Sequence, residues 1–304
     1  MPLAIITFDF DPLVQLGDRA VRWETVAIAG VVLLALVLAA LLAGRTGLPP
    51  DPDDPATGQR HLRRDDLLLI IIGIVPGAVI GGRIAYVVQH LDFYRSNPQA
   101  VLDTTSGGLA LSGAVVLGAL TGGLVARLFD APLGRWYRLA VLPMLLVLGL
   151  GKAAMILGGS GQGLPSAADF ATRYLGPGPW GSLGPAVPSD PSQAYEAIGV
   201  LVVIGLLGLA RLLGAFGRAD GRVFAVVLGL WAAVRLVVAG TWRDAPVIGG
   251  LNGEQLLDLA IVALALVVYL WIVRWGSRTG ETRPAPDAAR SELAWPDPET
   301  RRPF

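Results

Sequence analysis

The sequence contains no cysteine and only two histidines, His61 and His90, among its 304 residues. The lack of cysteine excludes disulfides, thiolate metal sites and a cysteine nucleophile in this chain. Two histidines are too few for a histidine-based metal centre, so we expect no metal and no other cofactor. The formal net charge is zero, which gives no support to nucleic-acid binding.

Charge is also scarce. Charged residues make up 16% of the chain and hydrophobic residues 53%, whereas about a quarter of the residues of a soluble domain are charged. Most of the charges lie in the gaps between long apolar stretches, which is typical of a membrane protein whose apolar segments are surrounded by lipid. We therefore predict an all-α integral membrane protein.

Seven apolar stretches have the length of about 20 residues that a helix needs to cross a bilayer. These predicted spans are Glu24–Leu42, Leu67–Val88, Leu109–Phe129, Leu139–Leu157, Ala194–Leu213, Val223–Trp242 and Leu256–Val273. They form one predicted membrane domain, residues 1–276, with a cytoplasmic loop at 49–66 and an extracytoplasmic loop at 158–190. The polar, Pro-rich tail at 277–304 is predicted to be disordered.

The arginines predict the direction of the spans. Arginines in alternate gaps and in the tail outnumber those on the opposite side by sixteen to five. The positive-inside rule places the arginine-rich side in the cytoplasm, so we expect the N-terminus outside and the C-terminus in the cytoplasm. Under this topology the loop at 158–190 lies outside, where it is either a functional cap or a flexible connector.

Three cations lie within the predicted spans: Arg83, Lys152 and Arg235. A buried charge in a membrane needs water, a partner or a ligand, and such charges often mark functional sites. All three lie toward the predicted outer ends of their spans, in one layer with polar residues from most of the other spans. The further polar residues of this layer are Glu24, Ser112, Gln193, Glu196 and Gln255.

Two interpretations of these cations remain open. In the first interpretation, the three cations hold the phosphate of an outer-leaflet phospholipid, because arginine binds phosphate through two parallel hydrogen bonds. Alternatively, Lys152 or Arg83 forms a buried ion pair with Glu196 that only locks the helices together. Lys152 is the single lysine of the chain and stands in the apolar run LVLGLGKAAMIL, so it is either a partner for Glu196 or a general base.

Four motifs stand near the outer ends of predicted spans. They are GGRIAYV (Gly81 to Val87), SGGLALSG (Ser106 to Gly113), DPSQAYE (Asp190 to Glu196) and LNGEQLLDL (Leu251 to Leu259). Their order and spacing resemble those of the prolipoprotein diacylglyceryl transferase family from about Val21 to Arg274. The PSQxYE element is the most specific of the four.

The resemblance implies an activity. Members of that family transfer the diacylglyceryl group of phosphatidylglycerol to the lipobox cysteine thiol of a prolipoprotein, and glycerol phosphate leaves. The implied partners are phosphatidylglycerol, the signal peptides of prolipoproteins and the membrane itself, and the implied location is the bacterial cytoplasmic (inner) membrane, crossed several times. The missing cysteine is no obstacle, because the thiol belongs to the substrate.

The resemblance also implies site residues. Arg83, Lys152 and Arg235 correspond to a lipid-phosphate site, and Lys152, Glu196 and Arg235 to the catalytic residues. The supporting residues that it implies are Tyr86, Gly107, Gly108, Ser112, Gly113, Gln193, Tyr195 and Gln255.

Several positions depart from the family pattern. Ser112 stands in place of a histidine, Lys152 of an arginine, Met155 of an asparagine and Ala239 of a glutamate. These changes suggest an alternative: a catalytically degenerate homologue that binds lipid or a lipoprotein partner, or an enzyme for a different lipid. A small-molecule transporter would need polar residues along the cytoplasmic halves of the spans as well, and very few occur there.

Overall fold

The computed structural model describes residues 5–48, 61–103, 108–184, 187–218 and 220–278. Within these ranges seven helices are long and apolar enough to cross a membrane, which confirms the predicted number of spans. They are α1 (Trp23–Ala43), α2 (Arg64–Gln89), α4 (Leu111–Leu128), α5 (Leu133–Met155), α6 (Ser192–Leu212), α7 (Arg222–Val238) and α8 (Gly253–Arg278). Most of the predicted loop at 49–66 and nearly all of the predicted disordered tail lie outside the described residues.

The prediction of an all-α chain is wrong in detail, because six short strands form three two-stranded sheets. The strands are β1 (Ile6–Phe8), β2 (Leu13–Leu16), β3 (Arg19–Arg22), β4 (Thr172–Tyr174), β5 (Pro246–Ile248) and β6 (Leu251–Asn252). β1 pairs with β4 in parallel, and the other two sheets are antiparallel hairpins. These strands, of two to four residues, are too short to be recognised from apolar patterning, and they pair backbone groups that no helix satisfies.

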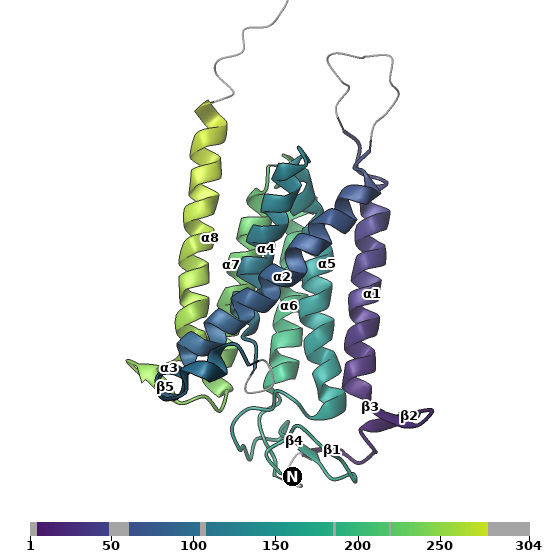
Figure 1. The fold of residues 1–304 in the computed structure, drawn as a ribbon, viewed down its shortest axis with the longest axis vertical. Helices are drawn as coiled ribbons and strands as arrows, with labels where there is room; N and C mark the ends of the chain where they lie inside the picture. The colour runs from purple at the N-terminus through teal and green to yellow at the C-terminus, as the bar shows by residue number, and fades with distance from the viewer. Residues whose placement is uncertain (1–4, 49–60, 104–107, 185–186, 219, 279–304) are drawn as a thin grey trace, which may run out of the picture.

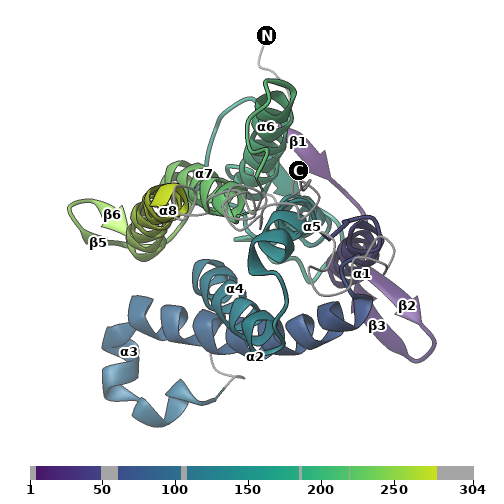
Figure 2. The ribbon, with the colours of Figure 1, turned by 90° about the horizontal axis from the view of Figure 1, so that it is seen from above.

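The strands and the short helix α3 (Leu91–Ser96) gather at one end of the helix bundle, below in Figure 1, which we call the strand-bearing end. Three 3₁₀ turns complete the described structure: η1 (Pro98–Val101), η2 (Ile156–Gly158) and η3 (Ala239–Thr241). Seen along the bundle, α2 lies beside α4, α1 beside α5, and α7 beside α8 (Figure 2). The arginine-rich gaps lie at the opposite end, where α1, α4 and α6 finish.

The tightest helix contact joins α2 and α4, and two glycines make it possible. A Cβ atom on Gly81 would overlap the carbonyl oxygen of Gly113, and a Cβ atom on Gly113 would overlap the carbonyl oxygen of Gly81. Small residues let helix backbones approach closely in lipid, where packing replaces the hydrophobic effect as the main attraction. The glycines of GGRIAYV and SGGLALSG therefore have a packing role.

The central apolar core joins α5, α6 and α7 and fixes the positions of three charged residues. Its members include Leu145, Leu148, Val200, Val203, Val227 and Trp231, all at most 5% exposed. Lys152, Glu196 and Arg235 each lie four residues from a member of this core, on the same helix face one turn closer to the strand-bearing end. The core thereby aims the three charged side chains at one another.

We expect Gly113→Ala to lower the stability of the helix bundle by about 1–3 kcal/mol, because the added methyl group meets backbone that has no room to yield. Thermal unfolding of the purified protein in detergent measures the effect. Gly208→Ala is the matched control, since nothing lies within 4 Å of a Cβ atom there. An equal midpoint shift in the two variants would contradict the close-contact explanation.

Candidate functional site

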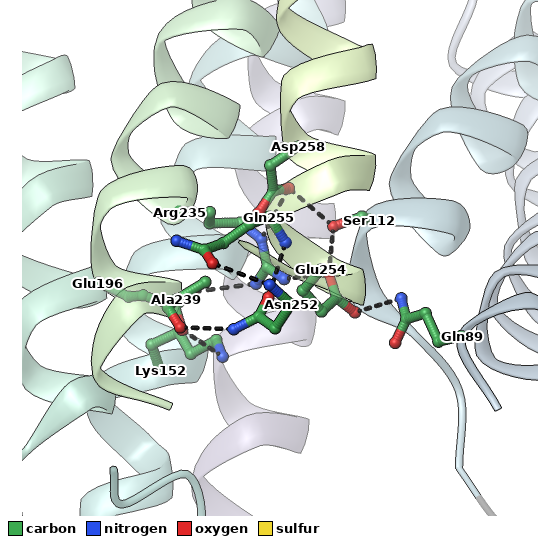
Figure 3. Close-up of polar contacts among 10 residues, drawn as sticks. All are labelled: Gln89, Ser112, Lys152, Glu196, Arg235, Ala239, Asn252, Glu254, Gln255 and Asp258. Carbon is green, nitrogen blue, oxygen red and sulfur yellow. Dashed lines mark hydrogen bonds and ion pairs between the residues drawn. The ribbon is translucent and has the colours of Figure 1, made fainter. Parts of the chain in front are cut away.

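A cluster of charged and polar side chains lies between the helices near the strand-bearing end (Figure 3). The polar cluster consists of Gln89 from α2, Ser112 from α4, Lys152 from α5, Glu196 from α6, Arg235 from α7, and Glu254 and Asp258 from α8. Each residue lies within two turns of the end of its helix. The structure thus brings together polar residues from six helices, and four of them, Ser112, Lys152, Glu196 and Arg235, belong to the layer that the sequence predicts.

Arg235 is the centre of the polar cluster. Its guanidinium contacts Glu196 at 3.0 Å and Glu254 at 2.8 Å, and its Nε atom lies 3.4 Å from Oδ1 of Asp258. The side chain is 1% exposed, and the ring of Trp242 lies 4.9 Å from the guanidinium carbon. A buried arginine needs such partners, because an uncompensated charge in this setting strongly destabilises the fold.

Lys152 joins the polar cluster from its edge. Its Nζ atom lies 2.8 Å from Oε1 of Glu196, the carboxylate whose other oxygen binds Arg235. The lysine side chain is 14% exposed, compared with 1% for Arg235. Lys152 is therefore the cation of the polar cluster that is more accessible to an incoming ligand.

Glu254 and Asp258, together with Gln89, are the residues of the polar cluster that sequence reasoning missed. Glu254 and Asp258 stand four residues apart in the last span and so share one helix face, which was the available signal. Ser112 lies 2.8 Å from Oε2 of Glu254 and 2.9 Å from Oδ1 of Asp258, and Gln89 donates to Glu254 at 3.0 Å. The single hydroxyl proton of Ser112 serves one carboxylate at a time.

The two carboxylates are not equally satisfied. Both oxygens of Glu254 accept hydrogen bonds, whereas Oδ2 of Asp258 has no hydrogen-bond partner among the described residues. With all groups ionised, the polar cluster holds two cations and three carboxylates. It therefore carries one more negative than positive charge.

A reciprocal capping box sets the start of α8 and the direction of its two carboxylates. Asn252 accepts a hydrogen bond from the backbone N–H of Gln255, and the Gln255 side chain accepts one from the backbone N–H of Asn252. The remaining amide groups donate to the carbonyl oxygens of Ala239 and Leu236 at the end of α7. Gln255, implied as a supporting residue, thus joins α8 to α7.

Arg83 is held by different partners from the other two predicted phosphate ligands. Its guanidinium donates to the backbone carbonyl oxygens of Ala100, Val101 and Asp103, and more weakly to that of Gly108. Lys152 and Arg235, by contrast, share Glu196. These contacts give Arg83 a role in fixing η1 and Asp103.

The predicted loop at 158–190 is folded against the strand-bearing end. The Tyr174 hydroxyl donates to the carbonyl oxygen of Ile156 at 2.9 Å, its ring stacks on Phe8, and Ser160 donates to Glu24. Burial raises the pKa of the Tyr174 hydroxyl, which therefore remains a neutral donor. The described residues of this loop are thus folded against the bundle, and its role as a functional cap stays a prediction.

The remaining implied residues have other surroundings than the members of the polar cluster. Gln193 is fully buried, and neither polar atom of its side chain has a hydrogen-bond partner among the described residues. Tyr86 stacks on His90, with Gly108 packed against its ring, and Tyr195 makes an edge contact with Phe170. Gly107 lies outside the described residues.

An apolar groove of about 410 Å³ runs between α1, α2, α4 and α5. It reaches Leu111, the neighbour of Ser112, and Leu148, one turn from Lys152. Its lining residues, among them Val115, are almost entirely apolar. A volume in the range of about 300–1,000 Å³ is typical of small-molecule sites. The groove thus offers space for an acyl chain whose polar end lies near the polar cluster.

The chemistry of the polar cluster is that of charge stabilisation. Two cations from different helices, held in place before any ligand arrives, stabilise charge that develops on a phosphate. Within the described ranges no three His, Cys, Asp or Glu side chains are grouped so that they would hold a metal ion. The carboxylates are instead engaged with Lys152 and Arg235.

Comparisons with known proteins agree with this architecture. The family model for prolipoprotein diacylglyceryl transferase matches residues 12–271. A phosphatidylglycerol–prolipoprotein diacylglyceryl transferase from Nostoc sp. is 27% identical over 96% of this chain and 97% of its own length. The protein of the same name from Beijerinckia indica is 33% identical over 89% of this chain and 96% of its own length.

The family match begins before α1 and ends within α8, so it includes six of the seven long helices entirely, most of α8, and every residue of the polar cluster. A third relative of the same name, from Symbiobacterium thermophilum, is 27% identical over 90% of the chain and 96% of its own length. The resemblance carried by the four sequence motifs is therefore confirmed: this chain belongs to the prolipoprotein diacylglyceryl transferase family.

Proposed function

We propose that this protein transfers the diacylglyceryl group of phosphatidylglycerol to the lipobox cysteine thiol of prolipoproteins. The observation that carries the proposal is the pairing of Lys152 and Arg235, from different helices, on the single carboxylate of Glu196. This paired site lies at the end of an apolar groove and beside a folded cap. The names of the relatives give the same reaction.

The proposed reaction forms one bond and breaks another. The thiolate sulfur of the prolipoprotein cysteine attacks the carbon of the diacylated glycerol that carries the phosphate. A carbon–sulfur bond forms, and the bond from that carbon to the phosphate oxygen breaks. Glycerol phosphate leaves with the bonding electrons. The leaving phosphate needs positive charge close by, and the thiol must lose its proton because the thiolate is the nucleophile.

Lys152 and Glu196 have complementary roles in this proposal. The partly exposed ammonium of Lys152 turns from Glu196 to the phosphate, whereas Arg235 remains neutralised by Glu254 and Asp258. Glu196, released from one of its two cations, then accepts the proton of the thiol. Arg83 acts as a positioning residue through the loop carbonyls that it binds, and Gln193 offers uncommitted hydrogen-bonding groups to the lipid headgroup.

We also propose the topology that the arginines predict. The strand-bearing end faces the outside, the N-terminus lies there, and the tail at 277–304 and the loop at 49–66 lie in the cytoplasm. The membrane is then the bacterial cytoplasmic membrane. In this arrangement the apolar groove admits phosphatidylglycerol from the bilayer, and the signal peptide of the prolipoprotein approaches the same polar cluster.

We expect Lys152→Met to lower the rate of thioether formation by about 10²–10³-fold, because it removes the ammonium group that faces the leaving phosphate. The assay combines purified protein, phosphatidylglycerol and a lipobox peptide. Lys152→Arg keeps the charge, and the family pattern has arginine at this position, so it should retain activity within about tenfold of the native protein.

The same assay tests the alternative of a degenerate homologue. The replaced family positions Ser112, Met155 and Ala239 are the observation that favours this alternative. A native protein that binds phosphatidylglycerol but never yields thioether product, beside an active relative, would exclude the transferase activity. Lipid binding that survives Lys152→Met would then support a binding function.

Substitution of Arg235 should lower the stability of the fold more than substitution of Lys152 does. Arg235→Gln leaves Glu254 and Asp258 without their counter-charge, and breaking a buried ion pair costs about 3–5 kcal/mol. Thermal unfolding in detergent measures the loss, which should exceed that of Lys152→Met. Adding Glu254→Gln and Asp258→Asn to the Arg235→Gln variant should recover much of it. A triple variant no more stable than Arg235→Gln would disprove this account.

A further inference from the structure

A second cavity, of about 380 Å³, lies at the opposite end of the bundle from the polar cluster, among α1, α5, α6 and α7. Three arginines line it. Arg135 and Arg138 come from the first turns of α5, three residues apart and so on one helix face, and Arg211 comes from the last turn of α6. The lining contains no Asp or Glu.

These three guanidiniums have hydrogen-bond donors to spare. Arg138 donates to the carbonyl oxygen of Gly217 at 3.1 Å, and Arg135 donates to that of Gly47. Each guanidinium carries five N–H donors, so one such bond leaves most of them unused. Neither these two arginines nor Arg211 forms an ion pair with any residue of the described ranges.

The rest of the cavity has a different chemistry. Leu139, Leu142, Leu207, Phe216 and Val223 give it a largely apolar wall next to the arginines. The arginines lie within two turns of helix ends, and the ends of membrane-spanning helices lie at the level of lipid headgroups. An anion that carries an apolar chain therefore fits this cavity better than a soluble anion does.

We propose that this arginine cavity binds the phosphate of an anionic phospholipid from the leaflet on the arginine-rich side of the membrane. Basic pockets between helices on that side are known recognition sites for anionic headgroups. The headgroup lies among Arg135, Arg138 and Arg211, and the first part of the acyl chains lies against the apolar wall. This lipid bridges α5 and α6, so its binding stabilises the bundle far from the polar cluster.

Native mass spectrometry of the detergent-solubilised full chain tests this site. The probes are phosphatidylserine, as an anionic lipid that is not the proposed substrate, and phosphatidylcholine as its zwitterionic counterpart. At about 1 kcal/mol for each arginine, the triple variant Arg135→Gln, Arg138→Gln, Arg211→Gln should bind phosphatidylserine about a hundredfold more weakly, and Arg211→Gln alone about fivefold. Arg127→Gln is the matched control, since Arg127 lies at the same end but outside the cavity.

Each outcome supports or overturns the proposal. The native protein should prefer phosphatidylserine over phosphatidylcholine, phosphatidylserine should raise its thermal midpoint, and both effects should persist in Lys152→Met. Equal phosphatidylserine binding in the native protein, in Arg211→Gln and in a folded triple variant would refute the site. An equal, arginine-dependent midpoint shift with inorganic phosphate alone would show a soluble-anion site instead. Arg211 is exposed, so we expect Arg211→Gln to fold. If the triple variant does not fold, the single variant still tests the site.

Discussion

The organisation of this protein depends on the need to neutralise one guanidinium in a place where water does not reach. Arg235 is 1% exposed and meets carboxylates from α6 and α8. A buried charge without partners would cost several kcal/mol, so the packing of three helices is tied to the formation of this contact. The core residues one turn away and the capping box at the start of α8 hold the partners in place.

The carboxylates of α8 also bear on how this chain departs from its family. The resemblance implies a glutamate at position 239, where Ala239 stands. Arg235 nevertheless keeps three carboxylate contacts, because Glu254 and Asp258 approach it from α8. Ser112, which stands in place of a histidine, donates to one of the same carboxylates. Two of the replaced positions, Ser112 and Lys152, therefore belong to one connected polar network.

The positive charges at the two ends of the bundle have different surroundings. At the strand-bearing end, Lys152 and Arg235 are paired with carboxylates beside a folded cap. At the other end, Arg135, Arg138 and Arg211 face a partly apolar cavity without acidic neighbours in its lining. Both arrangements suit the binding of a phosphate. When a cation of the polar cluster binds a phosphate, it releases a carboxylate. The arginines of the cavity have no acidic residue in the lining to release, so they only hold the phosphate. The first suits chemistry and the second suits binding.

The sequence by itself determined the seven spans, because long apolar runs have few other uses, and it placed Lys152, Glu196 and Arg235 in one layer, because depth follows from position along a span. It also indicated the family through four motifs. The tertiary structure decided which polar residues meet. Periodicity does not show which face of α8 turns toward α7, so Glu254 and Asp258 were missed. Arg83 was grouped with Lys152 and Arg235, although its guanidinium donates to backbone carbonyl oxygens at and after η1. The pairing of β1 with β4 was likewise decided only by the tertiary structure, since it joins segments that lie far apart in the chain.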